Sequence, residues 1–221
     1  MATPARLVDL SHTVEDGMVT YKGLPAPLIC DYLSREASRS RYAAGTEFQI
    51  GRIDMVANTG TYIDSPFHRY ARGKDFSRLA LESIADLECV VIRATEGRSR
   101  AIRRLPVEVE RLRGKALLVH TGWDANWRTD QYFEDHPFLT GELAEQLVAA
   151  GVALVGIDSF NIDSTDDRTR PVHSTLLGAD IPIVEHLCGL GALPERGAIF
   201  YAVPVKVKRM GTFPVRAFAR V

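Results

Sequence analysis

The sequence predicts an α/β fold in which helices flank a mixed β-sheet, and three neighbouring segments support this prediction. Residues 116–123 and 152–158 are short apolar runs, which is typical of strands buried on both faces. Between them, residues 140–151 have apolar side chains at helical spacing, with Thr140 as a candidate N-cap and Gly151 as the stop. A strand–helix–strand unit of this kind favours a right-handed parallel crossover within one sheet.

The N-terminal quarter alternates between strand and loop signals. Residues 7–12 predict a short first strand. Residues 17–27 contain two glycines and two prolines, so we expect an ordered loop there, within an extended N-terminal loop over about residues 11–30. Residues 28–56 alternate well enough for two strands, and we interpret their charged connection at residues 34–42 as a solvated turn.

Local signals also predict the remaining elements. Apolar runs that favour β-structure predict strands at residues 89–94, 198–207 and 211–219. Capping residues and apolar spacing predict helices at residues 81–87 and 107–112, a third that ends at Gly178, and a fourth with Pro182 in its first turn.

A group of acidic residues follows the strand predicted at residues 152–158. Binding sites in open α/β sheets gather at the carboxyl ends of strands, so this loop lies where a site is expected. Its spacing does not fit a calcium-binding EF loop. We interpret most of these side chains as caps of turns or as partners of Arg168 and Arg170. The group comprises Asp158, Asp163, Asp166 and Asp167.

Length and composition are those of a folded globular protein. The 221 residues are 46% hydrophobic and 25% charged, so we expect one domain over residues 1–221. A net charge of −1 offers no general attraction for polyanions, and we expect no nucleic-acid partner. No apolar run is long enough to span a membrane, and the N-terminus lacks a signal-peptide core, so no membrane partner is expected.

The cysteines indicate a reducing compartment. Cys30, Cys89 and Cys188 are an odd number, are widely separated, and never form a C-x-x-C pair. This pattern excludes a zinc ribbon and fits free thiols better than a disulfide framework. We therefore expect a cytoplasmic protein.

The stretch from Asn58 to His68 has the composition of a hydrolytic site. It reads Asn-Thr-Gly-Thr-Tyr-Ile-Asp-Ser-Pro-Phe-His. Gly60 allows a tight backbone path, and the Ser-Pro pair after Asp64 favours an extended turn. We therefore expect a stiff loop that holds the carboxylate of Asp64 near the imidazole of His68. A carboxylate beside a group that titrates near neutral pH suits acid–base or metal chemistry.

This stretch resembles the signature of the metal-dependent cyclase family, to which bacterial kynurenine formamidases and isatin hydrolases belong. That signature reads His-x-Gly-Thr-His-x-Asp-x-Pro-x-His. The matching positions here are Gly60, Thr61, Asp64, Pro66 and His68. Asn58 and Tyr62 replace the two leading histidines, which bind metal in the family. The resemblance implies the family's swivelling β/β/α architecture.

Two further landmarks of the family are present. A Thr-Gly-Trp turn that lines the family's substrate pocket matches residues 121–123, so Trp123 and Trp127 are candidate pocket residues, with simple core packing as the alternative. In the family, a histidine before Leu-Leu and a glutamate after Pro-Ile-Val bind metal. His173 and Glu185 occupy these positions. The landmarks span residues 7–220, almost the whole chain.

The resemblance implies a site in which metal-activated water attacks an amide or lactam carbonyl. Carried over by position, Asp64, His173 and Glu185 would hold one divalent ion, and such a ligand set suits zinc or manganese. The ion would activate water and polarise the carbonyl. His68 would act as general base and then donate a proton to the leaving nitrogen.

The second metal site of the family is weakened by the two replacements. An amide oxygen is a weak ligand, and a neutral phenol with a pKa of about 10 is a poor one near neutral pH. Tyr62 is instead a candidate donor to a developing oxyanion, and Asn58 a candidate for orienting substrate. We therefore expect one ion rather than two.

Three functions are compatible with the sequence. The first is a one-metal hydrolase of C–N bonds in a small amide, lactam or related carbonyl compound. The second is a metal-free acid–base enzyme for cyclisation or dehydration, and the third is a small-molecule-binding paralogue without catalysis. Retention of His68, His173 and Glu185 favours the first, because a binder has no chemical need for all three. The extended N-terminal loop suggests a homodimer or homotetramer in which it contacts a neighbouring subunit.

Overall fold

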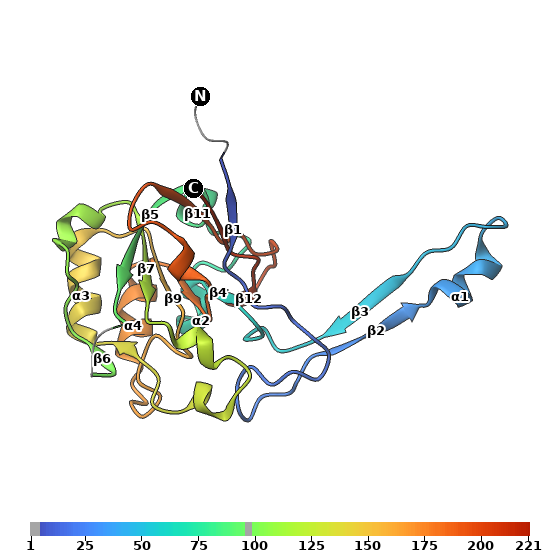
Figure 1. The fold of residues 1–221 in the computed structure, drawn as a ribbon, viewed down its shortest axis with the longest axis horizontal. Helices are drawn as coiled ribbons and strands as arrows, with labels where there is room; N and C mark the ends of the chain where they lie inside the picture. Colours follow the sequence, from blue (N-terminus) through green and yellow to red (C-terminus); the bar gives the residue numbers. More distant parts are fainter. Residues whose placement is uncertain (1–4, 96–98) are drawn as a thin grey trace.

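The computed structural model describes residues 5–95 and 99–221. Within these residues, one mixed sheet contains nine strands in the order β1-β13-β11-β5-β7-β9-β10-β4-β12 (Figure 1). The strands are β1 (Leu7–Asp9), β4 (Tyr62–Asp64), β5 (Leu87–Arg93), β7 (Ala116–His120), β9 (Leu154–Ile157), β10 (Ile183–Glu185), β11 (Ala198–Tyr201), β12 (Thr212–Pro214) and β13 (Phe218–Arg220). The mixed α/β fold predicted from the sequence is therefore confirmed.

The four central strands β5, β7, β9 and β10 are parallel, and antiparallel strands flank them on both sides. Helix α3 (Gly141–Ala150) connects β7 to β9, which confirms the predicted parallel crossover. The Thr140 side chain accepts from the backbone N–H of Leu143. Gly151 ends the helix in the left-handed conformation, with a φ of 75°.

Apolar side chains fill both faces of the sheet. On one face, α3 and α4 (Pro171–Gly178) pack over the central strands, and Figure 1 shows the two helices side by side there. On the other face, the core includes Phe76, Leu190 and Phe200. The site described below lies on the face covered by α4, because α4 supplies one of its histidines.

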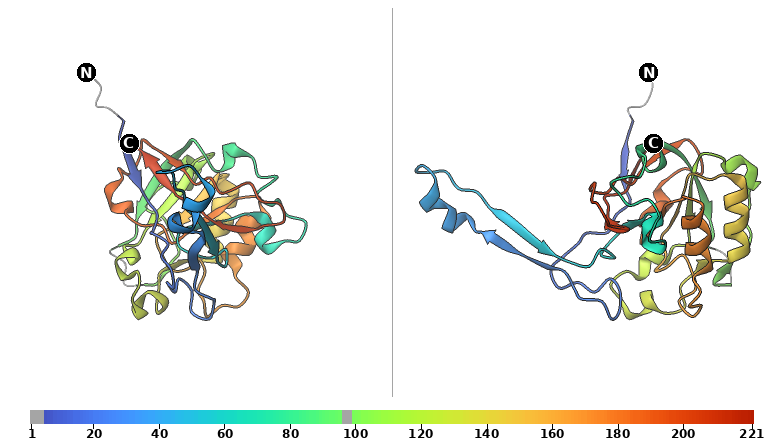
Figure 2. Two further views of the ribbon diagram at one scale, coloured as in Figure 1. Left: turned by 90° about the vertical axis from the view of Figure 1, so that its right-hand side faces the viewer. Right: turned by 180° about the vertical axis from the view of Figure 1, so that it is seen from behind.

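A hairpin arm projects from this body (Figures 1 and 2). It consists of β2 (Leu28–Leu33) paired antiparallel with β3 (Ile50–Asp54), outside the main sheet. The solvated turn predicted at residues 34–42 is wrong, because α1 (Arg35–Ser38) and the 3₁₀ helix η1 (Arg39–Arg41) form there. Ser34 caps α1 by accepting from the N–H of Ala37.

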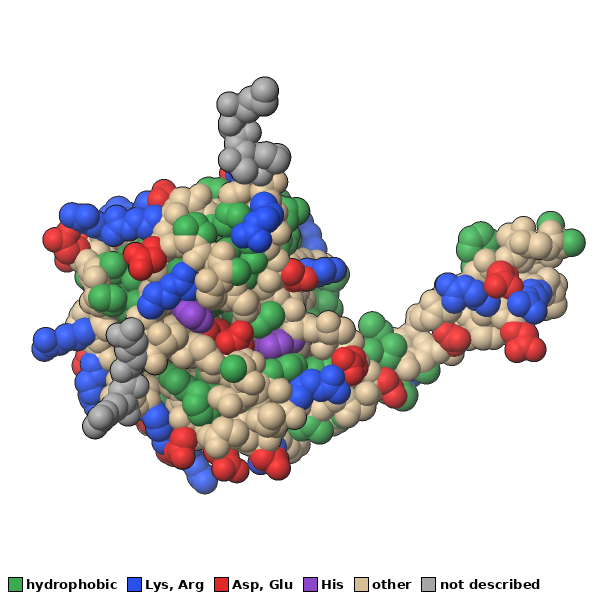
Figure 3. Space-filling view, viewed as in Figure 1, with side chains coloured by type: hydrophobic (Ala, Val, Ile, Leu, Met, Phe, Trp, Pro, Cys, Tyr) green, Lys and Arg blue, Asp and Glu red, His purple; other side chains and the backbone are tan. Residues whose placement is uncertain are grey.

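The arm exposes large apolar side chains, and Figure 3 shows apolar atoms at its tip and along its length. Burial of such side chains is strongly favourable in water, so an exposed group of this size is uncommon on the surface of a monomeric protein. The exposed side chains are Leu28, Tyr32, Tyr42, Phe48, Ile50 and Ile53.

Two corrections concern the site itself. Residues 62–64 were expected in a loop, but they form β4 inside the main sheet, and the one-turn helix α2 (Pro66–Arg69) follows at once. No helix begins near Pro182 within the described residues. Residues 183–185 form β10 instead, because the β-branched Ile183 and Val184 pair with β9 and β4.

Other predicted elements are shorter than expected. Leu81–Ser83 and Val109–Leu112 are 3₁₀ helices (η2 and η3) rather than α-helices. Strand β11 ends at Tyr201, and residues 215–217 separate β12 from β13. The remaining elements are β6 (Ala101–Ile102), paired with β8 (Phe138–Leu139), and the 3₁₀ helices η4 (Trp123–Asn126), η5 (Asp130–Phe133) and η6 (Leu190–Ala192).

Two sequence expectations concern the whole chain. All three cysteines are free thiols, as expected, although Cys30 is exposed on the arm. Among the described residues, none of the helices has both the length and the apolar character that a membrane crossing requires.

Candidate functional site

Strand pairing brings three site residues onto one face of the sheet. Strands β4 and β10 are antiparallel neighbours, and Tyr62 lies opposite Glu185. Side chains two residues apart on a strand share a face, so Asp64 points to the same side as Tyr62. Helices α2 and α4 pack together on this side and add His68 and His173. Five of the eight predicted site residues therefore meet, although they come from four separate elements.

Thr212 connects the carboxylate of Asp64 to the imidazole of His68. The Thr212 hydroxyl donates to Asp64 Oδ1, and Thr212 Oγ1 lies 2.7 Å from His68 Nδ1. A hydroxyl has one proton, and an ionised carboxylate only accepts. His68 must therefore donate from Nδ1 to Thr212, which leaves Nε2 of a neutral His68 with a free lone pair.

Asp163 orients the imidazole of His173 through a hydrogen bond to its Nδ1. Asp163 Oδ2 lies 2.6 Å from His173 Nδ1, and the carboxylate also accepts the backbone N–H groups of Val172 and His173. Asp163 therefore caps α4 and holds the imidazole with Nε2 towards the site. Nε2 lies 3.6 Å from Asp64 Oδ2 and 3.7 Å from Glu185 Oε1. A carboxylate behind a histidine is the usual support of a metal-binding imidazole.

Both oxygens of Glu185 accept hydrogen bonds. Tyr62 donates its phenol proton to Oε2 at 2.6 Å, and the backbone N–H of Ile162 donates to Oε1 at 2.6 Å. Burial and the negative charge of Glu185 raise the pKa of Tyr62 well above its ordinary value. Tyr62 is thus a neutral donor whose only proton is engaged by Glu185, rather than one free for an oxyanion.

The buried ionisable groups strongly shift the pKa values of one another. Burial would lower the pKa of His173, but Glu185, Asp163 and Asp64 raise it to about 10. Burial raises the pKa of Glu185 to about 7, against the influence of His173. Burial also opposes ionisation of Asp64, but His173, His68 and Thr212 lower its pKa overall. The cluster therefore favours a positive charge at its centre.

The same cluster fits a divalent cation. Asp64 Oδ2 is buried and, among the described residues, has no hydrogen-bond donor. Such an atom is costly unless something positive faces it. One ligand atom each from Asp64, His68 and His173 lie within 4.8 Å of one another. One carboxylate and two imidazoles are ligands that zinc and related transition metals accept.

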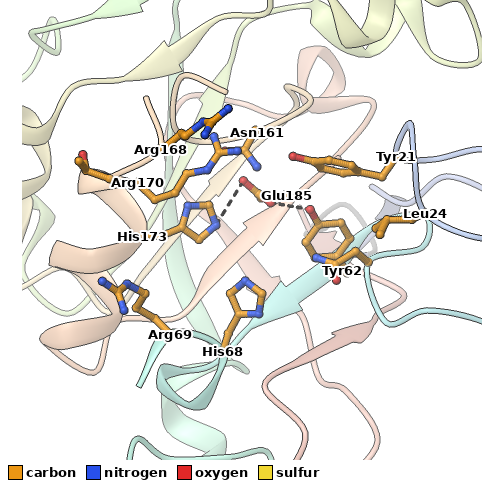
Figure 4. A pocket seen from close by; sticks show the side chains of 12 residues that line it. Tyr21, Leu24, Tyr62, His68, Arg69, Asn161, Arg168, Arg170, His173 and Glu185 are labelled. Atoms are coloured by element: carbon orange, nitrogen blue, oxygen red, sulfur yellow. Dashed lines mark hydrogen bonds and ion pairs between the residues drawn. The ribbon is translucent and has the colours of Figure 1, made fainter. Parts of the chain in front are cut away.

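A pocket of about 300 Å³ opens over this cluster (Figure 4). His68, His173, Glu185, Tyr62 and Asn58 line it, and the base of the arm contributes Tyr21 and Leu24. This size is at the lower end for small-molecule sites. Asn58, the candidate for orienting substrate, is thus one of the residues that line the pocket.

The two tryptophans lie elsewhere in this chain and do not line this pocket. Trp127 stacks on His12 at 3.8 Å between ring centroids, and it contacts His186 edge-on. Trp123 donates from Nε1 to the carbonyl of Tyr132. Trp127 therefore belongs to an aromatic cluster with His186, and His186 in turn contacts Tyr62.

Two residues of the site were missed by sequence reasoning. Asp163 was treated as one of four similar aspartates, although a signal existed: it precedes a proline-started helix whose first N–H groups need an acceptor. Thr212 gave no signal, because its contacts are with residues far away in the chain.

Comparisons with known proteins agree with this geometry. The profile of a protein family described as putative cyclase matches residues 8–164. The chain belongs to this family. A kynurenine formamidase of Erythrobacter litoralis is 27% identical over 202 residues, covering 91% of this chain and 88% of that protein. A kynurenine formamidase of Bacillus cytotoxicus is 29% identical over 215 residues, covering 96% of each.

Solved structures of the cyclase fold are also similar. Isatin hydrolase A from Labrenzia aggregata matches with a TM-score of 0.80 at 21% identity, covering 98% of this chain and 94% of that one. A potential metal-dependent hydrolase with cyclase activity matches with a TM-score of 0.72 at 24% identity, covering 98% of both. The family resemblance inferred from the sequence signature is therefore confirmed.

Proposed function

We propose that the chain is a metal-dependent hydrolase that cleaves a C–N bond in a small amide, lactam or related carbonyl compound. The observation that supports this most directly is the buried, donor-free Oδ2 of Asp64 beside Nε2 of His173, within reach of His68. The curated relatives named kynurenine formamidase and the isatin hydrolase fold add support for hydrolysis of a C–N bond.

One divalent ion, zinc or manganese, would bind to Asp64 and His173, with Glu185 Oε1 3.7 Å from Nε2 of His173 and His68 near enough to be a further ligand. When bound, such an ion activates water and polarises a carbonyl group. The chain itself supplies the orientation: Asp163 holds His173 with Nε2 towards Asp64, and Thr212 engages Nδ1 of His68. Asn58 lines the pocket next to Tyr62, where it can hold a substrate polar group.

The Tyr62–Glu185 hydrogen bond favours one ion over two. The phenol stands where the resembling signature has a histidine ligand, and its proton engages Glu185 Oε2 at 2.6 Å. A second cation at this place would have to displace that donor. We therefore expect a metal content of one ion per chain.

His68 acts through Nε2, either as the general base or as a ligand of the ion. Nδ1 is committed to Thr212, so only Nε2 is available. The variant His68→Gln separates the two roles. If His68 is the general base, His68→Gln should keep its metal and lose turnover. If the variant loses both metal and turnover, His68 is a ligand of the ion.

Metal analysis of the purified chain tests the hydrolase proposal. We expect one zinc or manganese per chain, and its loss in Asp64→Asn and His173→Gln, with retention in the arm variant Asp54→Asn. Activity against a panel of formamides and lactams should disappear on chelation and return on adding metal. Activity that survives exhaustive chelation would instead support the metal-free acid–base enzyme. Tight ligand binding with no turnover across the panel would support the non-catalytic paralogue.

The hairpin arm supports a homodimer or homotetramer. It projects its exposed apolar side chains away from its own subunit, and its base lines the pocket through Tyr21 and Leu24. We propose that the arm packs on a second copy of the chain. Sedimentation should show a dimer or tetramer, and Tyr32→Ser combined with Ile53→Ser should shift it towards monomer. A monomeric wild-type chain at micromolar concentration would contradict this proposal.

We further propose one folding domain over residues 1–221, located in the cytoplasm, with no nucleic-acid or membrane partner. The free cysteines support a cytoplasmic location, and the net charge of −1 supports the absence of a nucleic-acid partner. A single cooperative unfolding transition would support the single domain. Retention on heparin at physiological salt would contradict the absence of a polyanion partner.

A further inference from the structure

Three arginines line the candidate pocket. Arg69 is the last residue of α2, and Arg168 and Arg170 lie in the loop before α4. Of the two roles expected for the nearby aspartates, capping is the one observed at Asp163 and Asp167, and no carboxylate of the described residues forms an ion pair with any of the three arginines. The aspartates have other partners, since Asp166 faces Arg100, Asp167 caps Thr169, and Asp163 caps α4.

Most donors of these guanidinium groups remain available. Arg170 donates from Nη1 to the carbonyl of Ser164, and Arg69 donates from Nε to the Ser174 hydroxyl. Arg168 makes no hydrogen bond with another described residue. Because each guanidinium has five N–H donors, a ligand can still take several. Figure 4 shows Arg168 and Arg170 on the wall next to Asn161, and Arg69 on the wall next to His68.

The pocket is therefore polarised. Its base contains the buried carboxylates of Asp64 and Glu185, which favour a cation, and its upper walls contain three positive charges. Tyr21 and Leu24 add an aromatic ring and an aliphatic side chain to the lining, and the Tyr21 hydroxyl is hydrogen-bonded to Arg170. A planar guanidinium matches a carboxylate with two parallel hydrogen bonds, and this pairing is among the strongest in proteins. A neutral compound of the same size would leave the three arginine side chains without a charged partner.

We propose that the substrate has a carboxylate group, which Arg168 and Arg170 bind while the C–N bond lies over Asp64 and His173. Arg69 adds positive charge from the opposite wall. The chain is thus a hydrolase of anionic amides and discriminates against neutral amides and lactams. The reaction part of this statement rests on the proposed function, whereas the recognition of a carboxylate does not.

Turnover of matched pairs tests the discrimination. The probes are N-formyl-L-phenylalanine and 2-formamidobenzoate, each compared with its methyl ester. We expect a kcat/KM higher by about tenfold or more for the free acids, because a charge-assisted hydrogen bond contributes about 1.5–3 kcal/mol. Equal values for acids and esters would overturn the proposal.

Variants connect the effect to the arginines. Arg168 is the cleaner position, because its side chain makes no hydrogen bond or ion pair with another described residue that a substitution would break. Arg168→Gln should raise KM for the acids by about tenfold with little change in kcat or in ester turnover, and Arg168→Lys should recover part of the loss. Arg78→Gln, at an exposed arginine outside the pocket, is the matched control and should change nothing. An unchanged KM in Arg168→Gln and in Arg170→Lys would overturn the assignment.

Equilibrium binding keeps the test independent of catalysis. Calorimetry with benzoate and with benzamide, on metal-loaded and on chelator-treated protein, separates the arginines from any direct metal contact. Benzoate should bind about tenfold more tightly than benzamide in both preparations, and Arg168→Gln should remove the difference. If benzoate binds in this way and no amide is cleaved, the hydrolase proposal fails and carboxylate recognition stands. Equal binding of the two probes overturns carboxylate recognition itself.

Discussion

Asp163 Oδ2 lies 2.6 Å from Nδ1 of His173. The same carboxylate accepts the first backbone N–H groups of α4, and it orients the imidazole with Nε2 towards Asp64. Helix capping and ligand orientation thus depend on the same side chain. A substitution at Asp163 should affect folding and metal binding together, which distinguishes it from a change in the ligands themselves.

Asp163→Asn should lower metal affinity by about 10- to 100-fold, as is typical when the support of a metal-binding histidine is lost. It should also lower the free energy of unfolding by about 1–3 kcal/mol, because buried N–H groups lose a charged acceptor. Metal titration and urea unfolding measure the two effects. Asp167→Asn, which removes only an exposed turn cap, is the control. A normal metal affinity in Asp163→Asn would contradict the orienting role.

Thr212→Val should reduce turnover much more than Thr212→Ser. The hydroxyl donates to Asp64 and accepts from His68 Nδ1, so its removal frees His68 to adopt the other tautomer. Serine keeps the hydroxyl and should preserve most activity. We expect about a 10-fold or larger loss of kcat for valine, the size of effect known for removed orienting groups. Equal activity of the two variants would show that Thr212 is only a packing residue.

Gly211→Ala should disturb the site through the backbone of His68. A Cβ at position 211 would lie 2.5 Å from the Cα of His68, which is closer than atoms can approach. The strain should cost about 1–3 kcal/mol of unfolding free energy and displace His68, so activity should fall as well. Gly51→Ala is the matched control, because its nearest neighbour is a flexible Gln49 side chain at 3.5 Å. Similar unfolding midpoints for the two variants would contradict the close approach.

Stability should fall in acid because of histidines that are buried without charge. Burial lowers the pKa of His136 to about 4 and that of His186 to about 3, whereas the unfolded chain has values near 6.5. Below pH 6.5 these histidines therefore bind protons in the unfolded state, whereas in the folded state they stay neutral until the pH approaches their lower pKa values. Each histidine lowers the unfolding free energy by about 1.4 kcal/mol per pH unit as the pH falls from 6.5 towards its folded pKa.

The variant His136→Phe isolates one of these contributions. Its unfolding free energy between pH 6.5 and 4 should depend less steeply on pH than that of the wild type, by about 1.4 kcal/mol per unit. Contributions from Glu185 and from the other histidines cancel in the difference. Urea unfolding at pH 7, 6 and 5 makes the measurement. Parallel curves for the two proteins would place the His136 pKa at its ordinary value.

The signature residues and their ligand types were readable from the sequence, but their secondary structure was not. The expected loop around Asp64 is a strand inside the main sheet, and the helix expected near Pro182 is the strand that carries Glu185. Three-residue strands are too short for a periodic pattern to identify them. Their pairing with each other and with β9 stabilises them, and that pairing depends on the order of strands in the sheet.

By itself, the sequence determined the α/β class and the β7–α3–β9 crossover, because caps and apolar spacing act between residues close in the chain. The candidate ligands followed from the resemblance of three stretches to the family's landmarks. Only the tertiary structure decided that Thr212 orients His68, that Asp163 orients His173, and that three arginines face the pocket. These contacts join residues brought together by strand order and helix packing. Their free energies depend on burial and distance, which no local pattern of residues specifies.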